Sequence, residues 1–336
     1  MAKTWQSTPI PSPEYTKYDE VASNGDGTRL AACEYGGKVY LSDDSGASWA
    51  ETNPQPAGVR NWWSIASDLT GSNLVVAAFG DAIYTTSDYG ASWTRRLPGA
   101  SGIGWSTVAS DEDGSFLAAW ESSNNELWIS DDSGATWSLS PVTTDSDGGR
   151  LGLAMDADGS HLVIGGVFGP IYTSGNSGAS WTERAPGGLD EGDWYGCATS
   201  SDGSVMIVAN QWDKKVFVSI DYGVNWTDRT PVASKNYTRV TCNADGSMLV
   251  VAAQYDRIYY SSDGGVSWNE HRPAGDTDQI WYSIATGKSN DSLLAYIYAG
   301  TMYTYRSVFT FQPPADIVTN KRLIAFSNNT LYFEDI

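Results

Sequence analysis

The stretch Ser42-Asp43-Asp44-Ser45-Gly46-Ala47-Ser48-Trp49 decides the fold of this 336-residue chain, because it recurs along the sequence. Five further copies end on Trp93, Trp137, Trp181, Trp226 and Trp268. Subtracting successive tryptophan numbers gives steps of 44, 44, 44, 45 and 42 residues. A period of this length is typical of one four-stranded propeller blade.

The residues around each copy indicate short strands joined by tight turns. Small apolar runs such as 74–78 and 249–253 precede the copies and predict strands that are buried on both faces. Acidic turns ending in glycine, such as 111–114, precede those runs and predict hairpin turns. A calcium loop there would need a twelve-residue ligand pattern with a closing Glu, and none follows. No metal site is predicted.

The two ends of the chain complete the repeat. A seventh repeat has predicted strands near 281–286, 293–298 and 302–306 but no copy of the motif, so its outer strand must come from elsewhere. Trp5 stands 44 residues before Trp49, which indicates that residues 1–9 supply this strand and leave no open sheet edge. The predicted fold is all-β: a single seven-bladed β-propeller of four-stranded blades over residues 1–306, closed by the N-terminal strand.

Residues 307–336 have no counterpart in the repeat and are predicted to form a C-terminal extension, in which the alternating residues 308–311 predict a strand. Two apolar runs, 323–326 and 330–333, flank Ser327-Asn328-Asn329, which is a pattern typical of a β-hairpin. An isolated hairpin is marginally stable in water, so this one must pack on something. It either folds back on the propeller or docks on another chain, in a homo-oligomer or a larger assembly.

The repeated motif resembles the Asp-box, Ser/Thr-x-Asp-x-Gly-x-Ser/Thr-Trp, of sialidases, sortilin-type receptors and photosystem II stability and assembly factors. The resemblance covers nearly the whole chain and is nearest in style to the non-catalytic members. It implies that each box is a turn between the third and fourth strands of a blade, and that its acid binds backbone N–H groups. The residues at the acid position are Asp44, Asp88, Asp132, Asn176, Asp221 and Asp263. Asn176 departs from the pattern but remains compatible with a turn.

Charge and composition exclude several classes of partner and cofactor. Twenty basic against 40 acidic residues give a net charge of −20, which disfavours nucleic acid and anionic membrane surfaces. Three cysteines without a Cys-x-x-Cys pair and only two histidines suggest neither a disulfide framework nor a zinc site, and no cofactor is expected. The N-terminus lacks an apolar signal region and no run is long enough to span a membrane, so a cytoplasmic protein or a virion component is expected.

An enzyme is not predicted. The sialidase resemblance would require three inward arginines, and only Arg150 and Arg239 fall near the predicted inner rim. The Phe/Tyr-Arg-Ile-Pro stretch of that family is missing, and so are Gly-x-Ser-x-Gly and a phosphate-binding loop. A glycosidase needs only two suitably spaced carboxylates and stays open as an alternative. The acids predicted near the rim are Asp19, Glu20, Glu34 and Glu121.

Aromatic residues recur at two positions of the repeat, which should share one face of a propeller. One set precedes the centre of each predicted inner strand: Tyr18, Trp62, Trp105, Trp194, Tyr237 and Trp281, with Arg150 in the fourth repeat. The other set lies in the predicted loops after the second strands: Tyr35, Phe79, Phe168, Trp212, Tyr255 and Tyr298. The rings either fill the space between blades or are exposed as stacking platforms, and their exposure distinguishes the two.

The leading hypothesis is a non-catalytic binding module that recognises a glycan or a glycosylated partner through this aromatic face. The candidate ligand-binding residues are Trp62, Trp105, Arg150, Trp194, Trp212, Tyr255 and Trp281. The alternative is a structural or assembly scaffold, or a virion surface protein, that uses the propeller as a rigid head. Fold analogy does not separate the two, because propellers host many functions.

Overall fold

The computed structural model describes residues 3–9, 17–52, 54, 60–99, 104–142, 151–275, 278–287, 293–297, 301–307, 321–327 and 330–335. The chain divides into two compact units, Trp5–Arg306 and a smaller one made of Met1–Thr4 and Ser307–Ile336. Apart from one 3-10 turn, η1 (Pro186–Gly188), the regular structure of these residues is β-strand. Within the described ranges, no helix has the length and apolar character needed to cross a membrane.

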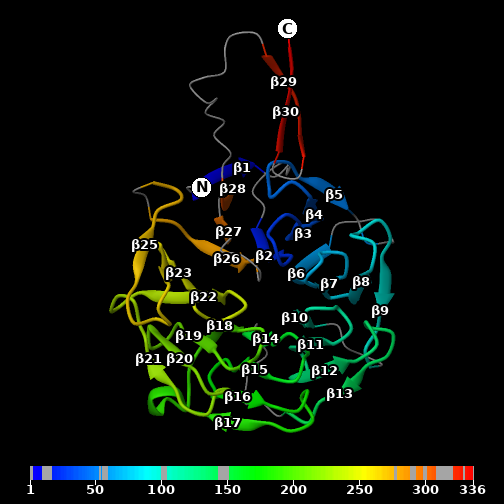
Figure 1. Ribbon diagram of the computed structural model, residues 1–336. Helices are drawn as coiled ribbons and strands as arrows, with labels where there is room; N and C mark the ends of the chain where they lie inside the picture. The colour runs from blue at the N-terminus through cyan, green and yellow to red at the C-terminus, as the bar shows by residue number, and fades with distance from the viewer. Residues whose placement is uncertain are drawn as a thin grey trace. The chain divides into compact units, whose positions relative to one another are not determined.

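The larger unit consists of four-stranded groups that follow one another along the chain around a common centre (Figure 1). Three separate sheets hold β10 (Trp105–Ser110), β11 (Leu117–Glu121), β12 (Glu126–Ser130) and β13 (Ser138–Leu139); β14 (Leu153–Met155), β15 (Leu162–Gly165), β16 (Ile171–Ser174) and β17 (Thr182–Arg184); and β18 (Trp194–Thr199), β19 (Met206–Asn210), β20 (Lys215–Ser219) and β21 (Thr227–Asp228). Two more hold β22 (Asn236–Cys242), β23 (Leu249–Gln254), β24 (Ile258–Ser261) and β25 (Asn269–His271); and β1 (Lys3–Pro9), β28 (Thr301–Ser307), β27 (Leu293–Ile297) and β26 (Trp281–Thr286).

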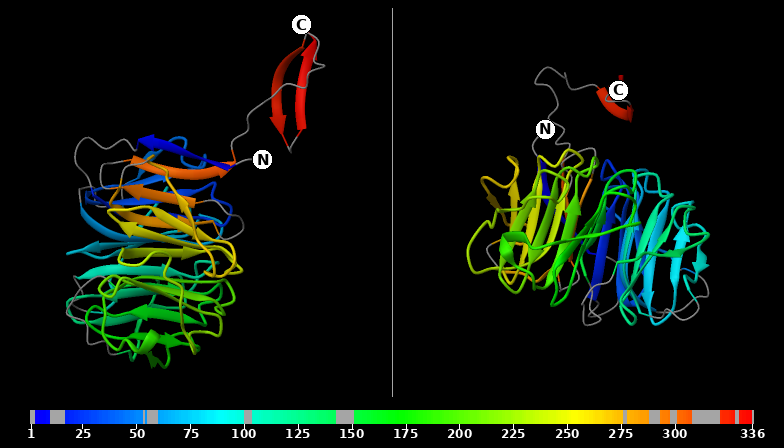
Figure 2. Two further views of the ribbon diagram at one scale, coloured as in Figure 1. Left: turned by 90° about the vertical axis from the view of Figure 1, so that its left-hand side faces the viewer. Right: turned by 90° about the horizontal axis from the view of Figure 1, so that it is seen from below.

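The remaining strands of the larger unit form one eight-stranded sheet, in which two groups are joined through β3 and β6. They are β2 (Lys17–Ser23), β3 (Leu30–Gly37), β4 (Val39–Ser42), β5 (Ala50–Thr52), β6 (Arg60–Ser67), β7 (Leu74–Phe79), β8 (Ile83–Thr86) and β9 (Thr94–Arg96). Figure 2 shows the groups of this unit from two further sides. The predicted all-β class is confirmed.

Strands from the two ends of the larger unit meet. β1 lies beside β28 in one sheet, although one strand begins the chain and the other lies near residue 300. The backbone N–H of Val21 in β2 donates to the hydroxyl of Ser283 in β26 at 3.1 Å. The first and last groups are therefore neighbours, as Figure 1 shows for β2 and β26.

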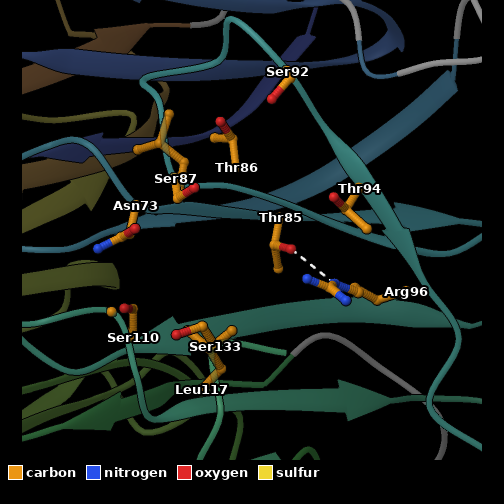
Figure 3. A pocket seen from close by; sticks show the side chains of 12 residues that line it. Asn73, Thr85, Thr86, Ser87, Ser92, Thr94, Arg96, Ser110, Leu117 and Ser133 are labelled. Carbon is orange, nitrogen blue, oxygen red and sulfur yellow. Dashed lines mark hydrogen bonds between the residues drawn. The ribbon is translucent and has the colours of Figure 1, made fainter. Parts of the chain in front are cut away.

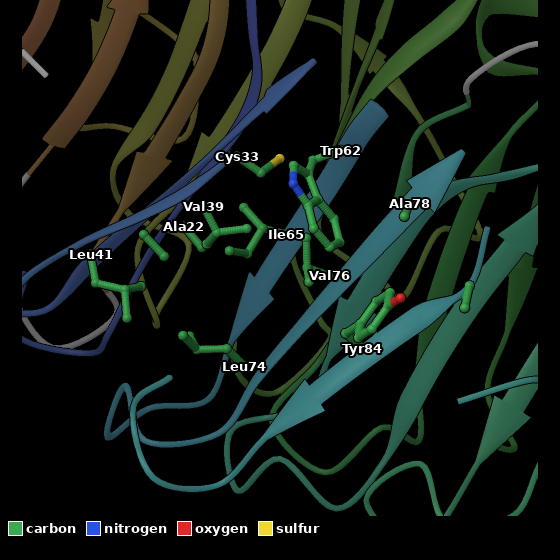
Figure 4. Close-up of a cluster of buried hydrophobic side chains, with 12 residues drawn as sticks. Ala22, Cys33, Val39, Leu41, Trp62, Ile65, Leu74, Val76, Ala78 and Tyr84 are labelled. Carbon is green, nitrogen blue, oxygen red and sulfur yellow. The ribbon is translucent and has the colours of Figure 1, made fainter. Parts of the chain in front are cut away.

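The second strand of each group supplies much of the core. In β7 and β23 five successive residues are buried, which confirms the strands predicted from the apolar runs at 74–78 and 249–253. Figure 4 shows one cluster that fills the space between two groups, including Cys33, Trp62, Ile65 and Tyr84. Burial of apolar area stabilises such a cluster by about 25 cal/mol per Å². All three cysteines are free thiols; Cys33 and Cys242 are buried, and Cys197 is partly buried.

The repeated motif forms a turn held together by its acid. One carboxylate oxygen of Asp44 accepts the backbone N–H of Ser48 at 2.8 Å, and the other accepts the Ser48 hydroxyl at 2.6 Å. Gly46 has a φ of +83°, which an L side chain rarely adopts. Equivalent bonds form at Asp88, Asp132, Asp221 and Asp263. At Asn176 the amide oxygen keeps the backbone bond, while its nitrogen donates to the Ser180 hydroxyl instead.

Backbone hydrogen bonds link the turns between first and second strands of successive groups. The N–H of Gly25 donates to the carbonyl of Leu69 at 2.8 Å, and the N–H of Leu69 donates to that of Glu112 at 2.8 Å. The series continues through Ala157 and Ser201 to Ala244. Main-chain atoms therefore tie six successive groups together, from the one that holds Gly25 to the one that holds Ala244, and such bonds do not depend on side-chain type.

The smaller unit contains an antiparallel hairpin, β29 (Lys321–Ser327) and β30 (Thr330–Asp335), in which Ser327 pairs with Thr330. This is the hairpin predicted from the sequence. The predicted strand at 308–311 lies outside the described residues.

Candidate functional site

The first strands of most groups carry a β-bulge directly after their aromatic residue. In β18, for example, the pairing with β19 shifts between Trp194 and Gly196. A bulge leaves one residue unpaired and redirects its side chain, and bulges are frequent next to functional sites. The bulge residues are Asp19, Trp63, Ser106, Tyr195, Thr238 and Tyr282.

Three successive bulges meet at one cavity of about 170 Å³, which we call the bulge cleft. The bulge residues Tyr195, Thr238 and Tyr282 come from β18, β22 and β26. The other lining residues are Gln211, Arg239, Gln254, Ile280 and Trp281. The cleft therefore spans three groups of strands, and each group contributes residues at the same position of the repeat.

The bulge cleft offers donors, acceptors and a positive charge. The hydroxyl of Thr238 is buried and makes no hydrogen bond in the described part of the chain. The Gln211 side-chain nitrogen donates to the Gln254 oxygen at 3.4 Å, so the two amides lie side by side. Arg239 donates to the carbonyl of Thr238 at 2.9 Å. Since buried polar groups are nearly always paired, the Thr238 hydroxyl is a group with which a polar atom in the cleft could form a hydrogen bond.

Electrostatics in this region centre on Tyr195. Burial raises the pKa of its hydroxyl, and the nearby carboxylate of Asp193 raises it further, whereas Arg239 lowers it. Burial also raises the pKa of Asp193. Tyr195 is therefore a neutral hydroxyl at physiological pH, able to donate and to accept a hydrogen bond.

Two exposed aromatic side chains flank the amide pair of the bulge cleft. Trp212 follows Gln211 and is 56% exposed, and Tyr255 follows Gln254 and is 62% exposed. Phe168, 50% exposed, packs edge-to-face on Trp212 with a centroid distance of 5.5 Å. Tyr255 has a φ of +57°, an uncommon conformation for a residue with a bulky side chain. The loops hold these rings out toward solvent.

The aromatic residues of the first strands have the opposite placement. Trp62, Trp105 and Trp194 are 0% exposed and Trp281 is 3% exposed, so their interpretation as stacking platforms needs correction: they fill the interior. The indole N–H groups of Trp62, Trp194 and Trp281 each donate to a backbone carbonyl of the preceding group, 25 residues earlier in the chain. Of the predicted ligand-binding residues, Trp212 and Tyr255 are exposed. Arg150 lies outside the described residues.

A second aromatic patch lies on the first two groups. Trp63, a bulge residue, stacks on Phe79 with a centroid distance of 4.3 Å and an interplanar angle of 15°. Tyr35 lies 6.5 Å from Trp63 and is 43% exposed. The side chain of Tyr18, and Tyr298 as a whole, lie outside the described residues.

The acids predicted near the rim include one that organises a loop. Glu121 is fully buried, and its carboxylate accepts the backbone N–H groups of Gly104, Ser123 and Asn124 at 2.7, 3.2 and 2.7 Å. These bonds explain its burial without a catalytic role. In the described ranges, no three His, Cys, Asp or Glu side chains gather in a way that could hold a metal ion.

Comparisons with known proteins show the fold. No protein-family model and no curated protein matches the chain. The structure of YCF48 bound to D1 peptide has a TM-score of 0.69 at 13% identity and covers 90% of this chain and 97% of that one. A streptogramin B lyase has a TM-score of 0.72 at 13% identity, covering 90% and 97%. A GH74 enzyme of Niastella koreensis has a TM-score of 0.69 at 19% identity, covering 88% and 53%. The chain is similar to these proteins in its β-propeller fold.

Proposed function

We propose that this chain is a seven-bladed Asp-box propeller, closed by its N-terminal strand, that binds a protein or peptide partner at the bulge cleft and serves as a rigid scaffold. Seven four-stranded groups in the described residues support the blade number. The place of β1 beside β28 and the bond from Val21 to Ser283 support the closure. The hydrogen bonds of the repeated acids support the Asp-box resemblance.

The observation that carries the binding role is the buried Thr238 hydroxyl, which lines a cavity beside two exposed aromatic rings. Leaving such a group unpaired costs about 1–3 kcal/mol, and a ligand that supplies a partner recovers this free energy. Trp212 and Tyr255 are residue types that often carry the binding energy of protein interfaces. Both rings are more than half exposed, so a partner can still cover them.

A peptide fits this cleft because its backbone groups, its carboxylates and its apolar side chains each find a matching group there. The amides of Gln211 and Gln254 can pair with peptide groups, Arg239 can pair with a carboxylate, and Trp212 and Tyr255 can cover an apolar side chain. YCF48, which shares the fold, has been solved with a D1 peptide bound. A rigid β scaffold with loop-borne contacts suits partner binding without a change of shape.

A glycan is the second candidate, favoured by the exposed edge-to-face pair of Phe168 and Trp212. Sugars stack on such rings and bond to amides and hydroxyls. The two candidates differ in which molecules should compete for the site. Free peptides should compete if the ligand is a peptide, and oligosaccharides should compete if it is a glycan.

The test is selection of peptides from a random display library on the immobilised chain, followed by calorimetry with the enriched peptides. Trp212→Ala and Arg239→Gln should each weaken binding about tenfold or more. The control is Ile220→Ala, which removes an apolar side chain that is 77% exposed in a box turn outside the cleft, and should leave binding unchanged. Peptides that bind all variants equally, or a chain that enriches only on a glycan array, would refute the peptide role.

For the hairpin β29–β30 we propose docking on another copy of the chain or on a larger assembly. Two strands alone bury too little surface to be stable in water. Truncation after Ser307 should abolish oligomers and keep the melting temperature. A destabilised monomer with unchanged association state would contradict docking.

A further inference from the structure

The box turn of one group packs against the start of the second strand of the preceding group. The residue before the box glycine has a positive φ in every described copy: 53° at Tyr89 and 60° at Tyr222, and 60°, 58°, 56° and 68° at Ser45, Ser133, Ser177 and Gly264. The ring of Tyr89 lies 4.8 Å from the guanidinium of Arg29, which immediately precedes β3. The ring of Tyr222 lies 4.7 Å from His161, which immediately precedes β15. At these two boundaries a tyrosine ring fills the space.

The boundary between β6–β9 and β10–β13 has no tyrosine ring. Serine stands at position 133, as it does at positions 45 and 177, and Asn73 precedes β7 at the position of Arg29 and His161. A cavity of about 150 Å³ lies here, lined by both residues (Figure 3). We call it the hydroxyl cavity. Asn73 and Ser133 are both small, so together they leave space that a tyrosine ring takes up at the two boundaries above.

The walls of the hydroxyl cavity carry many hydroxyl groups and one cation. Figure 3 shows Ser87, Ser92, Thr94, Ser110 and Ser133 around it, with Arg96 at one side. The Arg96 Nε donates to the Thr85 hydroxyl at 2.9 Å, so its guanidinium is held in place. Leu74 and Leu117 add two buried apolar side chains. None of the residues that line the cavity is acidic, although the chain as a whole carries a net charge of −20.

The hydrogen bonds of the wall define what a ligand must bring. Thr86 and Ser92 donate their hydroxyl protons to the carboxylate of Asp88 at 2.7 and 2.6 Å, and Ser110 donates to the carbonyl of Asp111 at 3.1 Å. The Thr86 hydroxyl also accepts the backbone N–H groups of Asp88 and Gly90 at 3.3 and 3.0 Å, so it is fully used by the turn. Ser92 and Ser110 present lone pairs to the cavity, so a ligand must supply O–H donors. Arg96 has only donors and a fixed positive charge, so it requires an acceptor, best a negative one. Sulfate, which carries no O–H group at neutral pH, satisfies the second requirement but not the first.

We propose that the hydroxyl cavity binds a small polyhydroxylated anion of the hexuronic acid class, with its carboxylate on Arg96 and its hydroxyls on Ser92 and Ser110. This site is separate from the bulge cleft and goes beyond the proposed partner binding. A hexuronate has about 13 non-hydrogen atoms. At the binding free energy per atom that is usual for small ligands, the dissociation constant is on the order of 1 mM.

The first test is an NMR titration of the full chain at fixed ionic strength with glucuronate, glucose and sulfate. Glucuronate should saturate the shifts, and glucose and sulfate should each bind at least about tenfold more weakly, since glucose lacks the negative charge and sulfate lacks O–H donors. Equal binding of glucose would contradict the role of Arg96, and equal binding of sulfate would reduce the cavity to a plain anion site. Either result, or no binding of glucuronate, overturns the proposal.

Two variants locate the binding. Ser133→Tyr installs the residue that Tyr89 and Tyr222 represent at the same backbone conformation, so the fold should persist while the cavity fills and glucuronate binding is lost. Arg96→Gln should weaken glucuronate at least about tenfold. Its matched control is Arg184→Gln, because Arg184 makes the equivalent bond to the Thr173 hydroxyl at 3.0 Å in another group. Full binding by Ser133→Tyr, or equal losses in the two arginine variants, would place the ligand elsewhere and refute the assignment.

Discussion

The indole nitrogen of Trp5 donates a hydrogen bond to Nδ1 of His271 over 3.2 Å. Trp5 lies in β1 and His271 ends β25, so the bond joins side chains 266 residues apart. The rings of Tyr260 and Tyr305 pack on the imidazole at centroid distances of 4.3 and 5.0 Å. Because an indole N–H can only donate, Nδ1 of His271 is unprotonated in this arrangement.

Stability should therefore depend on pH through His271. Burial lowers the pKa of its imidazole below 6.5 in the folded state, so the unfolded chain takes up this proton first as the pH falls. The free energy of unfolding should be highest above pH 6.5 and decrease between that value and the lower folded pKa. Urea unfolding on both sides of this window measures the effect.

The control for this prediction is His271→Phe, which keeps a ring and removes the titrating group. The difference in unfolding free energy between variant and wild type should change across the window. A difference that stays constant with pH would contradict a role for the His271 proton.

A second titrating group acts with the opposite sign. Burial, together with the charge of Asp113, raises the pKa of Asp111 to about 6. The folded state therefore holds this proton more tightly than the unfolded chain does, and the resulting stability is lost as the pH rises from about 4 to about 6. Asp111→Asn keeps an oxygen that can accept the Gly114 N–H, bonded at 2.8 Å, without the buried charge.

Asp111→Asn should raise the free energy of unfolding by about 1–2 kcal/mol at neutral pH and by little at pH 4. Asn24 and Asn243 already stand at the same position of their turns, where they accept the N–H groups of Arg29 and Met248. Chemical denaturation at the two pH values checks the prediction. A variant that is less stable than wild type at neutral pH would show that the ionised carboxylate contributes favourable bonds.

The repeat predicted much of the fold because its period and its residue types have local causes. In each repeat that has them, the acid and the glycine of the box form a turn, and the apolar run forms a buried strand. The same logic explains why the repeated tryptophans did not indicate the site. Trp62 and Trp194 recur because their buried rings fill the space between neighbouring groups and their N–H groups bond to the preceding group, which is a packing role.

The bulge cleft could not be predicted in this way, because its residues do not repeat. The position after the recurring aromatic residue holds Asp19, Trp63, Ser106, Tyr195, Thr238 or Tyr282, and periodicity does not reveal an extra unpaired residue in a strand. The one signal in the sequence was that this position varies beside one that is aromatic in all repeats but the fourth. Exposure of Trp212 and burial of Trp194 depend on the paths of the loops, which pairing between strands determines.

The buried tryptophans provide a matched test of hydrogen bonding. The Trp194 indole donates to the Gly169 carbonyl at 3.0 Å, whereas the Trp105 indole nitrogen is buried with no partner among the described residues. Trp194→Phe should remove both a bond and ring volume, and Trp105→Phe should remove ring volume and an unsatisfied donor. The first variant should lose about 1–2 kcal/mol more stability than the second, as measured by urea unfolding. Equal losses would mean that volume alone sets the cost.

The last prediction concerns β1, whose removal should leave β28 as an open sheet edge. Deleting residues 1–9 removes the strand beside β28 and the donor to His271, so the melting temperature should fall by at least about 5 °C. A synthetic peptide of residues 1–9 added in trans should restore part of this loss, because the vacated edge can pair with a strand again. The same peptide with Trp5→Ala should restore less, since it lacks the indole that packs on Tyr305 at 5.2 Å and bonds to His271. A deletion variant that melts like the full chain, or equal rescue by the two peptides, would contradict closure by β1 or the part of Trp5 in it.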